Sequence, residues 1–180
     1  MKNYFFKINN NRKRGFTLIE TIFYLVFLVV LLGVVITLIV YLSKTYQTIQ
    51  ATKNLESSAI FSLERMTRDI KNATSVDVGG SSLATSTAGV LLLNTSDAVG
   101  NVETIQFYVA TSTGAISVNT NGAYIGPLTL AGVKVSQLEF RLSTSTNSQA
   151  IKIDLGLTST VGGASTTKNF YDTVVLRGSY

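Results

Sequence analysis

The 180-residue sequence contains no cysteine and no histidine. Without cysteine, the chain can form neither a disulfide framework nor a thiolate metal site. Without histidine, it lacks the most common general base and the most common metal ligand. These absences exclude zinc sites and histidine-based catalytic triads, and we expect no enzyme activity, no cofactor and no metal.

Charged residues are also scarce, at 14% of the chain against 46% hydrophobic residues. This composition indicates a part that is embedded in a membrane. The net charge of +5 arises before Phe16, where five basic residues and no acidic ones occur, and the ten basic residues that follow are matched by ten acidic ones. The excess positive charge is therefore an N-terminal feature rather than a basic binding face.

Residues 21–43 form an apolar run of 23 residues without a charge. A helix rises about 1.5 Å per residue, so this run can cross a hydrocarbon core of about 30 Å. We predict a transmembrane helix over residues 16–43. The basic cluster precedes this helix, which places the N-terminus in the cytoplasm and the C-terminal domain outside.

The sequence predicts that the helix continues as an amphipathic segment over residues 44–76. No proline or glycine interrupts residues 44–73. Packing of the apolar stripe against the chain's own domain is favoured over a separate coiled-coil partner. The stripe consists of residues spaced by three and four: Ile49, Thr52, Leu55, Ala59, Leu63, Met66, Ile70 and Ala73.

Residues 77–180 are predicted to form a β-rich globular domain. It opens with a glycine- and hydroxyl-rich loop at 78–89, and alternating patterns then predict strands at 102–109, 133–142, 150–157 and 169–176. The alternation changes phase near Ser136 and Gln137, which predicts a bulge or a bend. Turns are expected at 119–122, 126–127, 143–148 and 161–165. The predicted fold is α+β, with a long N-terminal helix packed against an antiparallel sheet.

Glu20 is a carboxylate near the start of the apolar helix, within the sequence RGFTLIE at 14–20. A charge inside a spanning helix costs roughly 2.5–3.5 kcal/mol. A secretory signal peptide needs a shorter apolar core and a cleavage site with small residues. A plain signal anchor fits the length and the charges but leaves Glu20 unexplained.

The RGFTLIE sequence resembles the cleavage motif of type IV prepilins and of type II secretion pseudopilins. The resemblance covers residues 10–45 and implies a pilin-like fold, with cleavage of leader 1–15 between Gly15 and Phe16 by a membrane prepilin peptidase. It implies N-methylation of Phe16 and a role for Glu20 in filament assembly. The leader's basic residues would be Arg12, Lys13 and Arg14.

The resemblance also implies the partners, which are the peptidase, other pilins or pseudopilins, the inner-membrane assembly platform and, before assembly, the lipid bilayer. Glu20 of one subunit would then meet the N-terminal amine of a neighbour and set the axial stagger between helices. The segment LERMTRDIKNATSV resembles the helix end of J-type minor pseudopilins, with Arg68 and Asp69 as the matching pair. Together with the retained Glu20, and with Thr37 where many major subunits have proline, this favours a minor subunit.

Two other function classes remain open on the sequence. The outer domain could be a binding module, an adhesin or a DNA receptor, although its cations are dispersed and we expect no nucleic-acid partner. An enzyme would need carboxylates at a defined spacing, and none links Asp97, Glu103, Asp154 and Asp172. A calcium loop could lie at 97–103. The dispersed cations are Lys134, Arg141, Lys152, Lys168 and Arg177.

Overall fold

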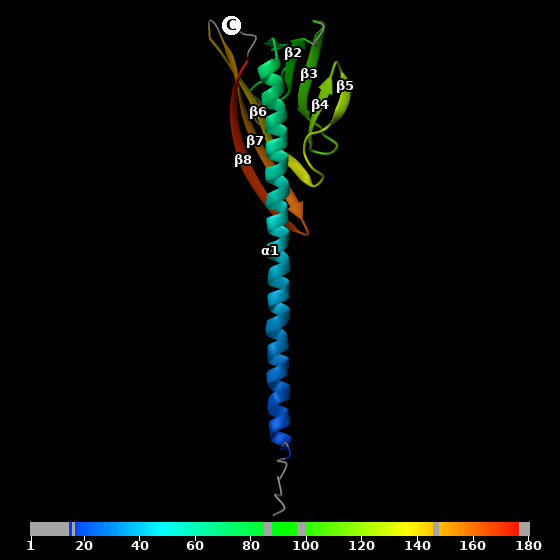
Figure 1. The fold of residues 1–180 in the computed structure, drawn as a ribbon, viewed down its shortest axis with the longest axis vertical. Coiled ribbons are helices and arrows are strands. Elements are labelled where there is room, and N and C mark those ends of the chain that lie inside the picture. Colours follow the sequence, from blue (N-terminus) through cyan, green and yellow to red (C-terminus); the bar gives the residue numbers. More distant parts are fainter. Residues whose placement is uncertain (1–14, 16, 85–87, 97–99, 146–147, 177–180) are drawn as a thin grey trace, which may run out of the picture. The chain divides into compact units, whose positions relative to one another are not determined.

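The structure is a computed structural model that describes residues 15, 17–84, 88–96, 100–145 and 148–176. Along this part of the chain, one long helix is followed by eight strands (Figure 1). The chain divides into two compact units, Met1–Ser43 and Lys44–Tyr180.

Helix α1 spans Leu18–Asn72, which confirms one long continuous helix of 55 residues. The predicted end at residue 76 is wrong, because the helix stops at Asn72 and Ser75–Val76 pair with another strand instead. It begins where the Thr17 carbonyl accepts hydrogen bonds from the N–H groups of Glu20 and Thr21, at 3.0 and 3.2 Å. An acidic residue, Glu20, lies in its first turn and a basic residue, Lys71, in its last turn. Both placements are favourable for the helix dipole.

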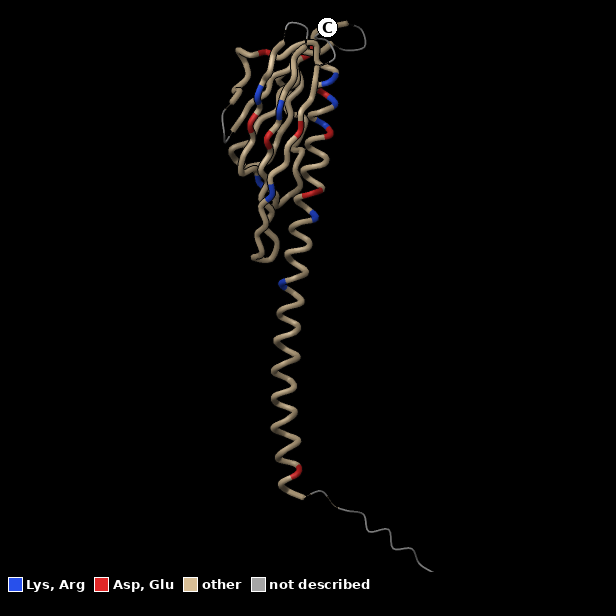
Figure 2. Tube along the Cα trace, turned by 90° about the vertical axis from the view of Figure 1, so that its left-hand side faces the viewer, with Lys and Arg blue, Asp and Glu red and all other residues tan. Residues whose placement is uncertain are grey.

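Within the first unit, every described residue from Thr17 to Ser43 is exposed except Glu20, which is half-buried. Glu20 is the one charged residue of α1 before Lys44. Figure 2 draws nearly all of this part of α1 in the colour of uncharged residues. The hydroxyl groups of Thr21 and Thr37 donate to the carbonyls of Leu18 and Gly33, at 2.7 and 2.8 Å. By length and composition, this helix could cross a membrane.

The described part of the second unit contains two antiparallel sheets. The first has the order β1-β2-β3-β4-β5 and the second the order β6-β7-β8. The strands of the first sheet are β1 (Ser75–Val76), β2 (Leu91–Ser96), β3 (Val102–Val109), β4 (Ile116–Thr120) and β5 (Ala123–Pro127). Those of the second are β6 (Val133–Thr144), β7 (Gln149–Val161) and β8 (Ala164–Val175).

The predicted helix and antiparallel sheet are confirmed, and the four predicted strands correspond to β3, β6, β7 and β8. The predicted bulge is also present, because the pairing of β6 with β7 shifts between Val135 and Gln137. The turn predicted at 126–127 is wrong, since Gly126 and Pro127 belong to β5 and pair with Val118 and Ser117. β1, β2, β4 and β5 were not predicted from the sequence.

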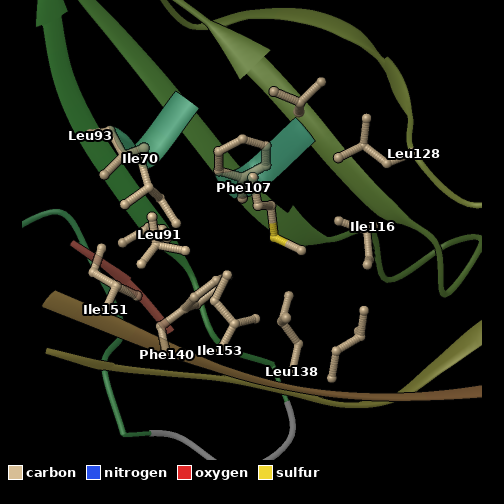
Figure 3. Close-up of a cluster of buried hydrophobic side chains, with 14 of the residues drawn as sticks. Ile70, Leu91, Leu93, Phe107, Ile116, Leu128, Leu138, Phe140, Ile151 and Ile153 are labelled. Carbon is tan, nitrogen blue, oxygen red and sulfur yellow. The ribbon is translucent and has the colours of Figure 1, made fainter. Parts of the chain in front are cut away.

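The hydrophobic core lies where the second half of α1 meets both sheets. Figure 3 shows Ile70 of α1 with side chains from β2, β3, β6 and β7 that point toward one another. The predicted helical stripe is correct from Leu55 onward, but Ile49 is 60% exposed. The buried stripe begins at Ala51, and residues 49 and 51 point to nearly opposite sides of a helix with 3.6 residues per turn.

Hydrogen bonds from two sides attach the second half of α1 to the rest of the domain. The loop after β5 is bound through Ser62, which donates to the Leu128 carbonyl at 3.3 Å, and through Ser58, which accepts from the Leu130 N–H at 3.1 Å. On the other side, Thr67 donates to the Asp172 carboxylate of β8 at 2.6 Å. The helix is therefore fixed to the domain by packing and by hydrogen bonds.

Candidate processing and assembly site

Gly15 is exposed, and a β-carbon placed on it would meet no atom within 4 Å. The fold of the described residues therefore does not require glycine at this position. A requirement for glycine here would come from another molecule that binds the extended chain. Four other predicted site residues, Arg12, Lys13, Arg14 and Phe16, lie outside the described residues.

Glu20 lies in the first turn of α1 and accepts a hydrogen bond from the Tyr24 hydroxyl at 3.0 Å. The first N–H groups of a helix and its positive dipole end also favour a carboxylate here. Within the described part of the chain, Glu20 makes no ion pair. The sequence analysis missed Tyr24, although its spacing of four residues from Glu20 places both on one helix face.

The helix that follows Glu20 is apolar on all sides and exposed on all sides. A helix of this kind is normally buried in a bilayer or among other apolar helices. A lone carboxylate on such a surface can pair with a cation that another chain supplies, and this pair gains strength when water is excluded.

The pair that supports a J-type assignment, Arg68 and Asp69, lies near the end of α1. The Asp69 side chain is buried, and its nearest cation is Arg65 at 2.7 Å, while Arg68 lies at 3.7 Å. Arg68 is exposed and makes no ion pair with Glu64, which lies four residues before it on α1. These contacts fix Asp69 within the domain and leave Arg68 accessible.

Two of the dispersed cations are brought together on β6 and β7. Arg141 binds Glu139 at 2.6 Å and lies 3.6 Å from Asp154, and Lys152 lies 3.2 Å from Asp154. A third cation, Lys168, binds Glu56 of α1 at 2.6 Å. These contacts neutralise cations that a nucleic-acid surface would need, and Arg177 lies outside the described residues.

Three of the carboxylates considered for catalysis have separate surroundings in the structure. Asp172 accepts from Thr67, Asp154 lies beside Arg141 and Lys152, and Glu103 is on β3. Asp97 lies outside the described residues, as does part of the calcium candidate 97–103. Among the residues that the structure describes, no group of three or more carboxylates could hold a metal ion.

Glu139 is a buried carboxylate that the sequence analysis missed, although its spacing of two residues from Arg141 on one strand was visible. The two side chains form a double hydrogen bond, at 2.6 and 3.1 Å. The Arg141 guanidinium holds the pKa of Glu139 below its ordinary value. This group therefore stabilises the fold at pH values above the ordinary glutamate pKa, about 4.3.

We expect acid to remove this contribution as the pH falls through the lowered pKa of folded Glu139. Urea unfolding of the wild type and of Glu139→Gln at pH 7 and pH 3 tests the expectation. The difference in unfolding free energy between the two proteins should be larger at pH 7 than at pH 3. A difference that is the same at both pH values would show that ionised Glu139 contributes nothing.

The sequence matches no protein-family model, and no curated protein or solved structure matches it either. The functional conclusion therefore depends on the residues and geometry of this chain.

Proposed function

We propose that this chain is a structural subunit, minor in type, of a type IV pilus-like filament or a type II secretion pseudopilus. A prepilin peptidase removes residues 1–15, Phe16 becomes the N-methylated first residue, and the N-terminal helix assembles into the filament core. The observation that carries the proposal is the exposed apolar first part of α1, up to Ser43, with one carboxylate, Glu20, in its first turn, five residues after Gly15.

Before assembly, the helix lies in the cytoplasmic membrane with the N-terminus inside and the domain outside. The basic residues before Phe16 favour this orientation. Internal hydrogen bonds of Thr21 and Thr37 suit a hydrocarbon environment, because they satisfy polar groups that lipid cannot. The Tyr24 hydroxyl partly replaces water at the Glu20 carboxylate.

Assembly supplies a cation that Glu20 does not find among the described residues of its own chain. Cleavage after Gly15 creates an amine at Phe16, and the amine of one subunit pairs with the Glu20 carboxylate of a neighbour. The pair replaces an unpaired charge in lipid with a neutralised one among packed apolar helices. It also favours one axial stagger, because only that stagger brings the two groups together. The partners are the peptidase, the other filament subunits and the inner-membrane assembly platform.

Glu20→Gln tests this role because it removes the charge and keeps the size of the side chain. The chain has no cysteine, so Ile49→Cys on the exposed face of α1 provides a single thiol for crosslinking in the membranes of the host. We expect Glu20→Gln to be processed normally and to give about tenfold fewer adducts with other subunits, which corresponds to about 1.4 kcal/mol of pairing free energy.

Glu56→Gln is the matched control, because Glu56 is also on α1 and its ion pair with Lys168 is within the domain. It should leave the adduct yield unchanged, since exposed ion pairs contribute little. Equal yields for Glu20→Gln and the wild type would overturn the assembly role of Glu20.

A further inference from the structure

Strand β8 forms one edge of the second sheet, and its outer side is unpaired in the part of the chain that the structure describes. It is 12 residues long and contains neither proline nor glycine. The other sheet edges are short or covered. β1 has two residues, β5 ends in Pro127, and β6 accepts hydrogen bonds from the N–H groups of Ala84 and Gly89. Natural sheets usually protect a long edge in such ways.

Two observations identify the backbone groups that face outward from β8. The turn Gly162–Gly163 has φ values of 56° and 90°, so Val161 and Ala164 form the hydrogen-bonded pair that closes a two-residue hairpin. Along β8, hydrogen-bonded and non-hydrogen-bonded positions then alternate, so the backbone N–H and C=O groups of every second residue point away from β7. The hydrogen bond of Thr173 supports this assignment, because its N–H group donates to the Asp172 side chain at 2.8 Å. The outward-facing residues are all exposed: Ser165, Thr167, Asn169, Tyr171, Thr173 and Val175.

A groove of about 700 Å³ lies between this edge and α1. Leu63 and Val175 contribute apolar surface, and Glu64 and Lys71 contribute charges. Neither Glu64 nor Lys71 makes an ion pair with a described residue. The groove therefore has room and unpaired charge for side chains of an added strand.

Charges on the helix-facing side of β8 select the added strand. Lys168 and Asp172 lie four residues apart on that side, where they contact Glu56 and Thr67 of α1. An antiparallel strand that carries a basic residue, and an acidic residue four positions later, places the base opposite Asp172 and the acid opposite Lys168. Opposite charges across a strand pair stabilise it, and like charges destabilise it.

We propose that the β8 edge binds an extended segment of a different polypeptide as an additional antiparallel strand, selected by a basic residue four positions before an acidic one. Backbone hydrogen bonds supply affinity, and side chains that enter the groove supply specificity.

A second copy of this chain has the same charge spacing, but membrane anchoring excludes it. β8 runs in the same direction as α1, because Lys168 contacts Glu56 and Asp172 contacts the later residue Thr67 (Figure 1). Antiparallel pairing of two β8 strands would therefore orient the two α1 segments in opposite directions. This exclusion rests on the proposed function, in which all copies enter the membrane in one orientation.

The test uses the full chain in nanodiscs with one copy per disc, and a fluorescent peptide with the sequence of residues 164–175, ASTTKNFYDTVV. Anisotropy reports binding. A peptide with lysine and aspartate exchanged, ASTTDNFYKTVV, should bind about tenfold more weakly, because both cross-strand pairs become repulsive. N-methylation of the peptide's asparagine and tyrosine should weaken binding by at least about tenfold, since those N–H groups face β8.

N-methylation of the peptide's lysine and phenylalanine is the matched control, because those N–H groups face away, and binding should change by less than about threefold. Absence of binding, or equal binding of all peptides, overturns the proposal. Homodimers of Asn169→Cys that a short bifunctional thiol reagent crosslinks in native membranes would assign the edge to a second copy and would also overturn it, since the two thiols would be diagonal neighbours. None of these outcomes depends on cleavage at Gly15, so the two proposals can fail separately.

Discussion

Gly15→Val should leave the leader attached to nearly every copy of the chain. The described fold does not need glycine at this position, since a β-carbon would meet no atom within 4 Å. A branched side chain next to the cleaved bond would obstruct an extended chain in a narrow peptidase site. Under the proposed function, the amine of Phe16 does not form without cleavage, and Glu20 then has no partner in a filament. We therefore expect loss of both processing and assembly, measured by intact mass and by recovery of the chain in filament fractions.

Gly33→Val is the control for this substitution. Gly33 also lies in the apolar segment, and a β-carbon on it would meet no atom within 4 Å. The variant should be cleaved as completely as the wild type. Normal cleavage of Gly15→Val would contradict prepilin processing at Gly15, and failure of both variants would indicate a general defect in membrane insertion.

Leu55→Ala should lower the free energy of unfolding of the second unit by about 2–5 kcal/mol. The Leu55 side chain is fully buried in the core between α1 and the sheets. Removal of its terminal carbons leaves a cavity that the surrounding strands cannot fill completely. Urea unfolding of the full chain in micelles, followed by the fluorescence of its eight tyrosines, measures the change.

Ile60→Ala on the same helix is the matched control, because Ile60 is 65% exposed. Its effect should remain within about 0.5 kcal/mol. Equal effects of the two substitutions would mean that a partner helix, rather than the chain's own domain, covers this part of α1.

The helix was predictable because its signals are long and consistent. An uncharged run and an uninterrupted amphipathic segment predicted one helix, and α1 spans Leu18–Asn72. The exposure of the Ile49 side chain was not predictable, because the apolar pattern does not reveal where the domain begins to cover the helix. In the structure this cover starts at Ala51.

The strands were predicted where alternation was clear and missed where it was not. β2 begins with three consecutive leucines, and of these three only Leu91 and Leu93 are buried. β4 has three consecutive buried residues, Ile116 to Val118, because both faces of this strand are covered. The turn residues Asn121 and Gly122 were recognised, but the short strands on either side were not.

The candidate site was predictable only in part. Glu20 was identified because a carboxylate is costly in an apolar helix, whereas Tyr24 depends on a side-chain contact that a pattern search does not reveal. The backbone groups that face outward from β8 could be identified only from the pairing register and from the hairpin at Gly162, which the sequence alone does not specify.

The most direct test of prepilin processing is mass spectrometry of the wild-type chain purified from the membranes of its host. We predict a mature chain that begins at Phe16, with one methyl group on its terminal amine. A chain that begins at Met1 in cells with an active prepilin peptidase would contradict the account, and Glu20 would then need another explanation.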